Sequence, residues 1–462
     1  MASRAGIIVL CVCLAVSGSA LAAGAESQAA WKAGLATVVI TPEQPMWMAG
    51  YAARNKPSEG KVHELHGKAL ALEDAQGARL VIVTADLIGF PRDFRDQLEK
   101  EVGDRYKLGR EGLLLNPSHT HSGPELRAWR TTQAWDLPEG QIDLCKQYNE
   151  TLRSKLVELV GRALADLAPA QLSYLHARAG FAMNRRSQTD RGYTIAPNAD
   201  GPVDHDVPVL RVDSPDGKLR ALLFGYACHN TTLDFYQFCG DYAGFAQEYV
   251  EETHPGTTAL FMIGCGGDQN PTPRRTLDWA KQHGRALANG VEAALQAKPR
   301  AVRGPLRVAL DEVSLELDGP PGIEQLKQQA QSTDKYQKRN AEDVLIALEK
   351  SGRVPSAYPY LVHVVQFGDD LTMIGLAGEV VVDYSLRLKR ELAGAPVWVA
   401  GYTNDVFGYV PSRRVLEEGG YEARGAILYY GTMLTPFTPL VEERIIGKVH
   451  ALVDKVRTPK SK

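Results

Sequence analysis

The sequence predicts an α/β fold with a mixed sheet, because strand-like and helix-like segments alternate along it. Short apolar runs rich in β-branched residues, such as 37–40 and 80–84, are typical of buried strands. The segments 92–106 and 143–168 carry patterns typical of helices, the second with apolar residues at helical spacing. No low-complexity linker divides the 462 residues. We therefore expect two or three closely joined domains, or one large one.

Further segments extend this alternation toward the C-terminus. We expect strands at 113–115, 170–176, 206–212, 220–228, 258–264, 305–316, 360–367 and 371–377. We expect helices at 243–254, 276–297, 323–351 and 381–393. The Lys- and Glu-rich segment 323–351 is predicted to be a solvated surface helix. The segments 124–140 and 184–206 are rich in Pro, Gly, Asp and Arg, and they are predicted to be loops of the kind that often carry function.

The first 25 residues have the pattern of a secretory signal peptide. Arg4 supplies a positive charge, residues 5–16 are almost wholly apolar, and residues 17–25 offer A-x-A cleavage sites. The apolar run is shorter than the roughly 20 residues that a membrane span needs. We therefore expect no transmembrane span, and an exported protein that is periplasmic or extracellular after cleavage.

Charge and cysteine content narrow the possible partners and the kinds of site that the protein could have. A net charge of −3 without a basic stripe argues against nucleic acid as a partner. Four cysteines lie beyond the predicted signal peptide, and export would permit disulfides among them, with three pairings open. They are Cys145, Cys228, Cys239 and Cys265. Their spacing lacks a C-x-x-C pattern, so a cysteine zinc site is not indicated.

The run His-Thr-His-Ser-Gly-Pro at 119–124 is the most informative motif. It follows the apolar segment 113–115, and in an extended backbone His119 and His121 point to the same side. Imidazole is the commonest protein ligand for zinc, and a strand end is a usual place for a site. Alone, such a pair is more often two histidines of a polar loop than a metal or catalytic site.

Four other segments place chemistry-bearing residues at strand ends or beside glycines. Each also has an ordinary structural reading: a hydrogen-bonded histidine, a tight turn, a carboxylate at a helix start or buried tyrosines. The residues are His229 after an apolar strand, Asn270 in Gly-Cys-Gly-Gly-Asp-Gln-Asn-Pro, Glu379 after Gly378, and Tyr409 with Tyr421 twelve residues later.

Taken in order, these motifs resemble the neutral, non-lysosomal ceramidase family. The resemblance spans roughly 33–440 and includes Asn184-Arg185 and the opening Ala36-Thr37-Val38-Val39-Ile40-Thr41-Pro42. It implies a mixed-sheet zinc-hydrolase catalytic domain at 33–445, followed by a basic tail at 446–462. Family ceramidases usually continue into a C-terminal immunoglobulin-like domain, which we do not expect here.

The resemblance also implies the roles of individual residues. One zinc ion per chain would be bound by His119, His229, Glu379 and Tyr409. His121 would transfer a proton, while Arg185 and Tyr421 would stabilise an oxyanion. The implied reaction is hydrolysis of the amide of an N-acyl lipid such as ceramide by water that the metal activates.

One departure concerns the position of Asn270, where the family carries an active-site serine. An amide can still donate a hydrogen bond, so a mechanism that uses metal-activated water survives the change better than one that uses a serine nucleophile. The true substrate is therefore left open.

Two alternatives accompany the lipid amidase. The first is a metal-assisted lyase or hydrolase of an acidic polysaccharide, in which Tyr421 would act as a base. Arginines of the loops suit an anionic substrate, although they suit solubility equally well. They are Arg127, Arg130, Arg185, Arg186, Arg191, Arg274 and Arg275. The second alternative is an inactive homologue that binds metal. A lipid substrate would also be compatible with peripheral contact to a membrane surface.

Overall fold

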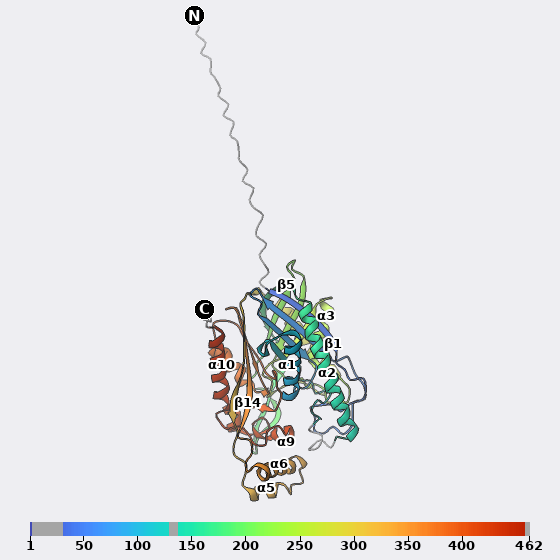
Figure 1. Ribbon diagram of the computed structural model, residues 1–462, viewed down its shortest axis with the longest axis vertical. Coiled ribbons are helices and arrows are strands. Elements are labelled where there is room, and N and C mark those ends of the chain that lie inside the picture. Colours follow the sequence, from blue (N-terminus) through green and yellow to red (C-terminus); the bar gives the residue numbers. More distant parts are fainter. Residues whose placement is uncertain (2–30, 129–136, 458–462) are drawn as a thin grey trace.

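The computed structural model describes residues 31–128 and 137–457, together with Met1. Its strands and helices form four layers (Figure 1). A nine-stranded sheet carries helices on one face and a second, four-stranded sheet on the other. The outer face of the second sheet is covered by α10 (Val441–Arg457) and α7 (Asp383–Glu391). The predicted α/β fold with mixed sheets is confirmed.

The nine-stranded sheet runs β10-β9-β8-β5-β1-β2-β3-β4, with β12 paired to β5. Pairing is antiparallel except for β3 with β4 and β9 with β10, which are parallel. The strands are β1 Trp31–Val39, β2 His66–Asp74, β3 Arg79–Ala85, β4 Leu113–Pro117, β5 Ala168–Arg178, β8 Asp206–Asp213, β9 Leu219–Tyr226, β10 Thr258–Ile263 and β12 Arg300–Val302.

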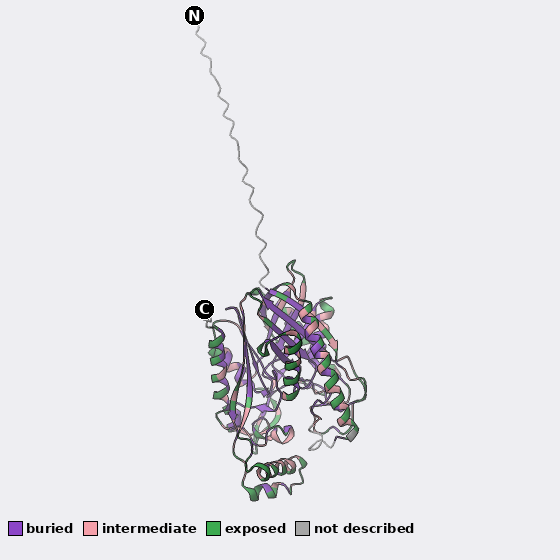
Figure 2. Cartoon of the chain, viewed as in Figure 1, coloured by how far each residue is buried: buried purple, intermediate pink, exposed green. Residues whose placement is uncertain are grey.

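Alternation of side chains across these strands builds two cores at once. In β2, β3 and β4 one set of apolar residues packs on the helices, and the intervening set packs on the second sheet. The covering helices are α1 Arg92–Tyr106, α2 Glu139–Ala165, α3 Asp241–Thr253 and α4 Leu277–Leu295. Figure 2 shows the central strands buried, while the covering helices turn exposed faces outward.

The second sheet runs β13-β14-β15-β17, with β15 and β17 parallel. Its strands are β13 Leu306–Glu316, β14 Ala357–Phe367, β15 Leu371–Leu376 and β17 Val397–Ala400. Two smaller sheets lie beside it, β11-β6-β7 and β16-β18. Their strands are β6 Ala182–Thr189, β7 Gly192–Asn198, β11 Gln269–Pro271, β16 Glu379–Val380 and β18 Tyr409–Val410.

Three sequence expectations are corrected. The predicted loop 184–206 begins in β6 and continues through β7, a polar hairpin whose residues lack the apolar alternation that reveals strands. The helix expected at 323–351 is two, α5 Ile323–Gln329 and α6 Lys335–Ser351. Asp334 begins the second helix as its N-cap. Its side chain accepts hydrogen bonds from the backbone N–H groups of Tyr336 and Gln337 at 2.8 and 3.1 Å.

The boundary expected at 445/446 falls inside α10. Apolar residues of this helix, including Ile446, Val449 and Leu452, are buried in the core of the second sheet, so the segment up to Arg457 packs with the domain. The helix continues past 445 because apolar residues recur at helical spacing. Residues 458–462, the signal-peptide prediction at 2–25, and positions 129–136 of the predicted loop 124–140 lie outside the described residues.

Two further observations concern the cysteines and the membrane. Cys145, Cys228, Cys239 and Cys265 are four separate buried thiols, so no disulfide joins them. Within residues 31–128 and 137–457, no helix combines the length and the apolar character that crossing a bilayer requires.

The topology brings the carboxyl ends of several strands to one place. β4 and β10 stand at opposite ends of the sheet order, yet the Asn116 side chain at the end of β4 accepts a bond from the N–H of Ile263 in β10 at 2.8 Å. The loops that follow β4, β9, β10, β15 and β17 therefore converge, and they carry the residues that the sequence singled out.

Candidate active site

His119 follows β4 in a turn that fixes its side chain. Its backbone has φ +56°, a left-handed conformation that non-glycine residues adopt at a cost, often at functional sites. The fully buried ring donates its Nδ1 proton to the carbonyl of Ile88 at 2.6 Å. With that proton engaged, Nε2 presents a lone pair to the site, which is the usual arrangement of a metal-binding histidine.

His229 follows β9 and repeats this arrangement. Its Nδ1 bonds to the carbonyl of Gly266 at 2.6 Å, in the glycine-rich loop after β10. Burial, with the Arg185 charge nearby, lowers the pKa of His229 to about 4, so the imidazole is neutral at neutral pH. Its Nε2 lone pair also faces the site, where the Tyr409 hydroxyl lies 3.0 Å away.

Glu379 opens β16 and points one carboxylate oxygen at both histidines. Oε2 lies 2.9 Å from Nε2 of His229 and 3.3 Å from Nε2 of His119. Oε1 accepts a hydrogen bond from the hydroxyl of Tyr430, whereas Oε2 is buried without a hydrogen-bond donor among the described residues.

This donor set fits a divalent cation. Two imidazole lone pairs and a carboxylate oxygen face one another at distances that would be repulsive without a positive charge between them. The ligand atoms of His119, His121 and His229 all lie within 4.8 Å of one another. Neutral nitrogens combined with a carboxylate are the ligand types that zinc prefers. The residues present could therefore hold the metal that the sequence predicts.

His121 lies in the same cluster. Its Nε2 is 3.2 Å from Nε2 of His119, and its ring stands edge-on to Tyr51 with centroids 4.8 Å apart. Burial, together with His119 and His229, lowers the pKa of His121 well below its ordinary value. The ring can therefore act on a bound substrate, as the sequence suggested, and its nitrogen is also close enough to join the metal group.

Tyr409, Arg185 and Asn270 form the adjacent wall. Strand pairing places Tyr409 directly beside Glu379. Arg185 donates from Nη2 to the Tyr409 hydroxyl at 2.8 Å and from Nη1 to Oδ1 of Asn270 at 3.2 Å. The register of β6 against β7 shifts between Asn184 and Arg186, and a bulge of this kind re-aims a side chain.

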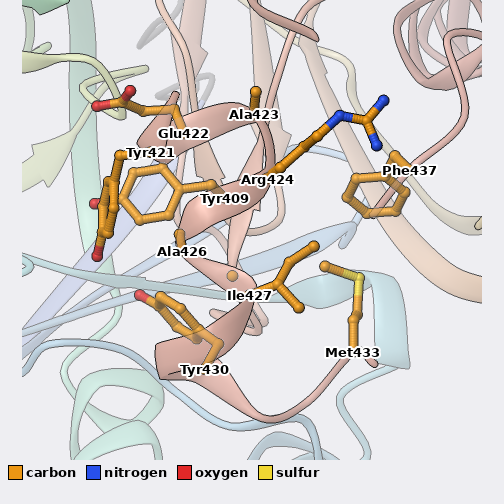
Figure 3. A pocket seen from close by; sticks show the side chains of 11 residues that line it. Tyr409, Tyr421, Glu422, Ala423, Arg424, Ala426, Ile427, Tyr430, Met433 and Phe437 are labelled. Carbon is orange, nitrogen blue, oxygen red and sulfur yellow. The ribbon is translucent and has the colours of Figure 1, made fainter. Parts of the chain in front are cut away.

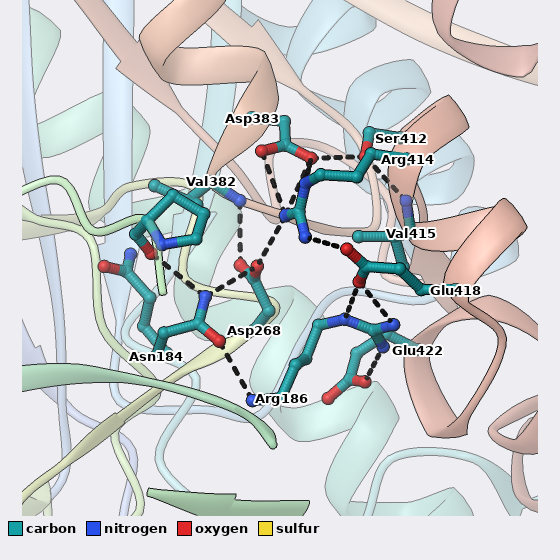
Figure 4. Close-up of polar contacts among 12 residues, drawn as sticks. Asn184, Arg186, Asp268, Val382, Asp383, Ser412, Arg414, Val415, Glu418 and Glu422 are labelled. Atoms are coloured by element: carbon teal, nitrogen blue, oxygen red, sulfur yellow. Dashed lines mark hydrogen bonds and ion pairs between the residues drawn. The ribbon is translucent and has the colours of Figure 1, made fainter. Parts of the chain in front are cut away.

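A chain of ion pairs joins Glu422, Arg186, Glu418 and Arg414 (Figure 4), and Glu422 links this chain to Arg185. Glu422 accepts from Nε of Arg185 at 2.8 Å and from Nη1 of Arg186 at 2.6 Å. Arg186 also pairs with Glu418, which Arg414 links to Asp383. The two consecutive arginines of β6 are thus held by one carboxylate.

Asp268 lies beside this chain of ion pairs (Figure 4). It accepts bonds from the Asn184 side chain at 3.2 Å and from the N–H of Val382 at 2.8 Å. Burial raises the pKa of Asp268 to about 7. Asp268 therefore ties the glycine-rich loop to β6 and to the segment that follows Glu379.

Tyr421 completes the predicted set. It begins a single π-helical turn, Tyr421–Gly425, and its ring stands edge-on to Tyr409 with centroids 5.3 Å apart. All eight residues that the sequence selected therefore lie in one region. They are His119, His121, Arg185, His229, Asn270, Glu379, Tyr409 and Tyr421.

Three further residues belong to the site and were not predicted from the sequence. Tyr430 lies on α9 (Ile427–Tyr430) and bonds to Glu379, and Glu422 pairs with the arginines. Tyr402, with φ +55°, packs at a tilt against the His119 ring, with centroids 4.4 Å apart. Gly401-Tyr402-Thr403-Asn404 directly follows strand β17, so the strand-end pattern that revealed His119 and His229 was available for Tyr402.

A cavity of about 280 Å³ opens onto these residues. Its lining is rich in tyrosine and includes His121 and Glu379 of the candidate metal-binding group. The described residues that line it are Gly50, Tyr51, Ala52, Ile88, His121, Arg127, Ile195, Glu379, Tyr409, Tyr421, Tyr429 and Tyr430.

A smaller, separate pocket lies on another side of three of these tyrosines (Figure 3). Tyr409, Tyr421 and Tyr430 border it, together with apolar side chains that include Ile427 and Met433. The three aromatic rings thus form part of the walls of both pockets.

Comparisons with known proteins agree with this geometry. The family model described as neutral/alkaline non-lysosomal ceramidase, N-terminal, matches residues 31–295. A crystal structure of neutral ceramidase from Pseudomonas aeruginosa superposes with a TM-score of 0.70 at 20% identity, covering 94% of this chain and 76% of that chain. A structure described as ceramidase complexed with C2 gives the same values. A search of curated proteins found no match. The motif-based resemblance and the expected fold are thereby confirmed.

Proposed function

Because this chain belongs to the neutral/alkaline non-lysosomal ceramidase family, we propose that it is a zinc-dependent hydrolase of the amide bond in an N-acyl lipid, ceramide or a related compound. The observation that carries the proposal is the orientation of two histidines. His119 and His229 each engage Nδ1 with a backbone carbonyl, and both direct Nε2 toward the same oxygen of Glu379.

In this proposal His119, His229, Glu379 and Tyr409 hold one zinc ion per chain. When bound, zinc supplies Lewis acidity that polarises an amide carbonyl and acidifies water. Arg185 donates to the Tyr409 hydroxyl and so favours electron density on that oxygen, which makes a phenol a better ligand. Tyr430 fixes the rotation of the Glu379 carboxylate through Oε1.

The remaining residues act on the substrate. His121 is a neutral imidazole beside the metal group and accepts a proton from attacking water at Nε2, then delivers it to the leaving nitrogen. Arg185 and Tyr421 supply hydrogen-bond donors to the oxyanion that develops on the acyl oxygen. Asn270, held by Arg185, offers an amide in place of a nucleophilic hydroxyl, so water is the nucleophile in this scheme.

The catalytic unit expected at 33–445 is proposed to extend through the rest of α10 to Arg457, because that helix packs with the domain. Export through the predicted signal peptide at 1–25 is part of the same proposal and rests on the residue pattern.

The test compares His119→Ala with His176→Ala, a control at an exposed position of β5. We expect the first variant to lose bound zinc, measured by atomic absorption, and the release of sphingosine from an N-acyl sphingosine. The control should keep both. Full zinc content and full turnover in His119→Ala would refute the assignment.

The same preparation separates the alternatives when it is offered uronic-acid polysaccharides. Release of a free amine from the lipid supports the amidase. An unsaturated product that absorbs in the ultraviolet would indicate the lyase instead. Bound metal without turnover of any substrate would indicate an inactive homologue.

A further inference from the structure

Arg127 places a buried positive group in the wall of the catalytic cavity. It is 6% exposed and lines the cavity together with His121 and Glu379. Its Nε and Nη2 donate to the two oxygens of Glu125 at 2.6 and 2.8 Å. This fork-shaped pairing occupies one edge of the planar guanidinium. The Nη1 group is not part of it and is bonded to none of the described residues.

Glu125 is itself held by the backbone. Oε1 of Glu125 accepts bonds from the N–H groups of Leu126 and Arg127 at 3.0 and 2.9 Å. Among the described residues, the carboxylate thus accepts from two backbone groups and from two nitrogens of the guanidinium. Glu125 therefore fixes the orientation of Arg127 and leaves its Nη1 group outside the pair.

Two tyrosine hydroxyls stand in the same cavity wall. Tyr421 and Tyr429 both line the cavity, with ring centroids 6.0 Å apart, and neither hydroxyl is bonded to another described residue. The Tyr429 ring packs against the ring of Tyr336 in α6, with centroids 4.7 Å apart. Arg127 can only donate hydrogen bonds, and a phenol donates readily, so this wall suits a ligand rich in acceptors.

From this arrangement we infer that the substrate carries a carboxylate close to the bond that is cleaved, and that Arg127 binds it, assisted by Tyr429. This inference deepens the proposed function and rests on it for the position of the reacting bond. A carboxylate accepts at both oxygens and meets the charge of the guanidinium, whereas the hydroxyls of ceramide offer no charge. The Nη1 donor of Arg127 and the hydroxyls of Tyr421 and Tyr429 are polar groups that a wholly apolar chain would leave without acceptors.

Two sources could supply the carboxylate, and they are tested side by side. N-lauroylglycine carries it on an acylated amine, and N-lauroylethanolamine is the matched amide with a hydroxyl instead. A glucuronate-containing disaccharide carries the carboxylate on a sugar, and its glucose counterpart is neutral. Binding of each compound to the zinc-loaded protein is measured by calorimetry, and kcat/KM is measured for every compound that is turned over.

The variant is the double substitution Glu125→Gln with Arg127→Met, because Arg127→Met alone would leave Glu125 without its partner in the protein interior. Arg413→Met, at an exposed arginine of α8 (Arg413–Glu418), is the matched control. Circular dichroism and zinc content establish that both proteins fold. Since a charge-assisted hydrogen bond is lost, the preference of the wild type for the carboxylate compound should fall about 10- to 100-fold in the double variant and stay unchanged in the control.

The outcomes distinguish this inference from the proposed function. A binding preference for either carboxylate compound that is lost in the double variant supports the inference, even if no amide is hydrolysed and the proposed function fails. Equal binding of charged and neutral partners by the wild type would overturn it. So would a preference that survives in the double variant, or no binding of any of the four compounds.

Discussion

Glu422 is predicted to be the most sensitive position in the ion-pair network behind the active site. Its side chain is 2% exposed and bonds to both Arg185 and Arg186, whose side chains are 7% and 2% exposed. Removing one partner of a buried pair costs about 3–5 kcal/mol, because the other charge remains buried and uncompensated. The substitution Glu422→Ala should therefore destabilise the protein strongly.

The size of the expected loss in unfolding free energy depends on which arginine loses its carboxylate partner. In Glu422→Ala, Arg186 keeps Glu418, to which it bonds at 3.0 Å. Arg185 retains only the neutral oxygens of Tyr409 and Asn270. One buried cation is thus left without a carboxylate, not two, so we expect a loss of about 3–5 kcal/mol in the free energy of unfolding and not twice that.

Urea unfolding at pH 7 measures this loss, and Glu417→Ala provides the matched control. Glu417 pairs with Arg413 on the same stretch of chain, but the two side chains are 65% and 66% exposed. An exposed pair contributes about 0–1 kcal/mol, so the control should unfold almost as the wild type does. If Glu422→Ala and Glu417→Ala were equally stable, the reasoning about buried charge would be refuted.

The pH dependence gives an independent check of the same group. Burial alone would raise the pKa of Glu422, but Arg185 and Arg186 lower it below its ordinary value near 4.5. A carboxyl whose folded-state pKa is lowered contributes stability above its unfolded pKa and loses that contribution as the pH falls through the folded-state value. Glu422→Gln cannot titrate, so its unfolding free energy should fall less than that of the wild type when the pH drops below about 4.5.

Two further substitutions test the metal group and the cavity. Tyr430→Phe removes the hydroxyl that orients Glu379, so zinc affinity, measured by competition with a chromophoric chelator, should fall about 10- to 100-fold; unchanged affinity would contradict the contact. Gly50→Ala would put a Cβ 2.4 Å from the ring of His121, at φ +102°, and should lower turnover about 100-fold. Gly256→Ala, at φ +86° with no atom within 4 Å of its Cβ, controls for backbone strain and should retain activity.

The parts of the site that could be predicted from sequence share one local pattern. His119 and His229 each follow an apolar strand directly, and Glu379 follows β15 closely, so strand periodicity alone places them at a sheet edge. Tyr430 offers no such pattern, because it reaches Glu379 from a short helix 51 residues further along the chain. A contact of that kind depends on the packing of two sheets, which no local pattern encodes.

The contrast between local patterns and distant contacts also explains which helices and strands could be predicted from the sequence. The helix at 92–106 was predicted with its observed bounds because its residues have a regular helical pattern. The hairpin β6–β7 carries polar residues on both sides, so nothing in its periodicity separates it from a loop. Its stability comes from pairing with β11 and from the ion pairs of Arg185 and Arg186, all of them contacts with distant segments.

The two large sheets meet directly at the site, and this contact sets its geometry. Leu115 of β4 exchanges two bonds with Asn404, which follows β17: its N–H donates to Oδ1 at 3.0 Å, and its carbonyl accepts from the Asn404 N–H at 2.8 Å. The Asn116 side chain donates to the carbonyl of Gly401 at 2.9 Å. His119 and Tyr402, whose rings pack against one another, both adopt positive φ within three residues of these bonds. Such strain persists only where the surroundings fix the backbone, so the bonds between the sheets are what hold His119 in the orientation that a metal ligand needs.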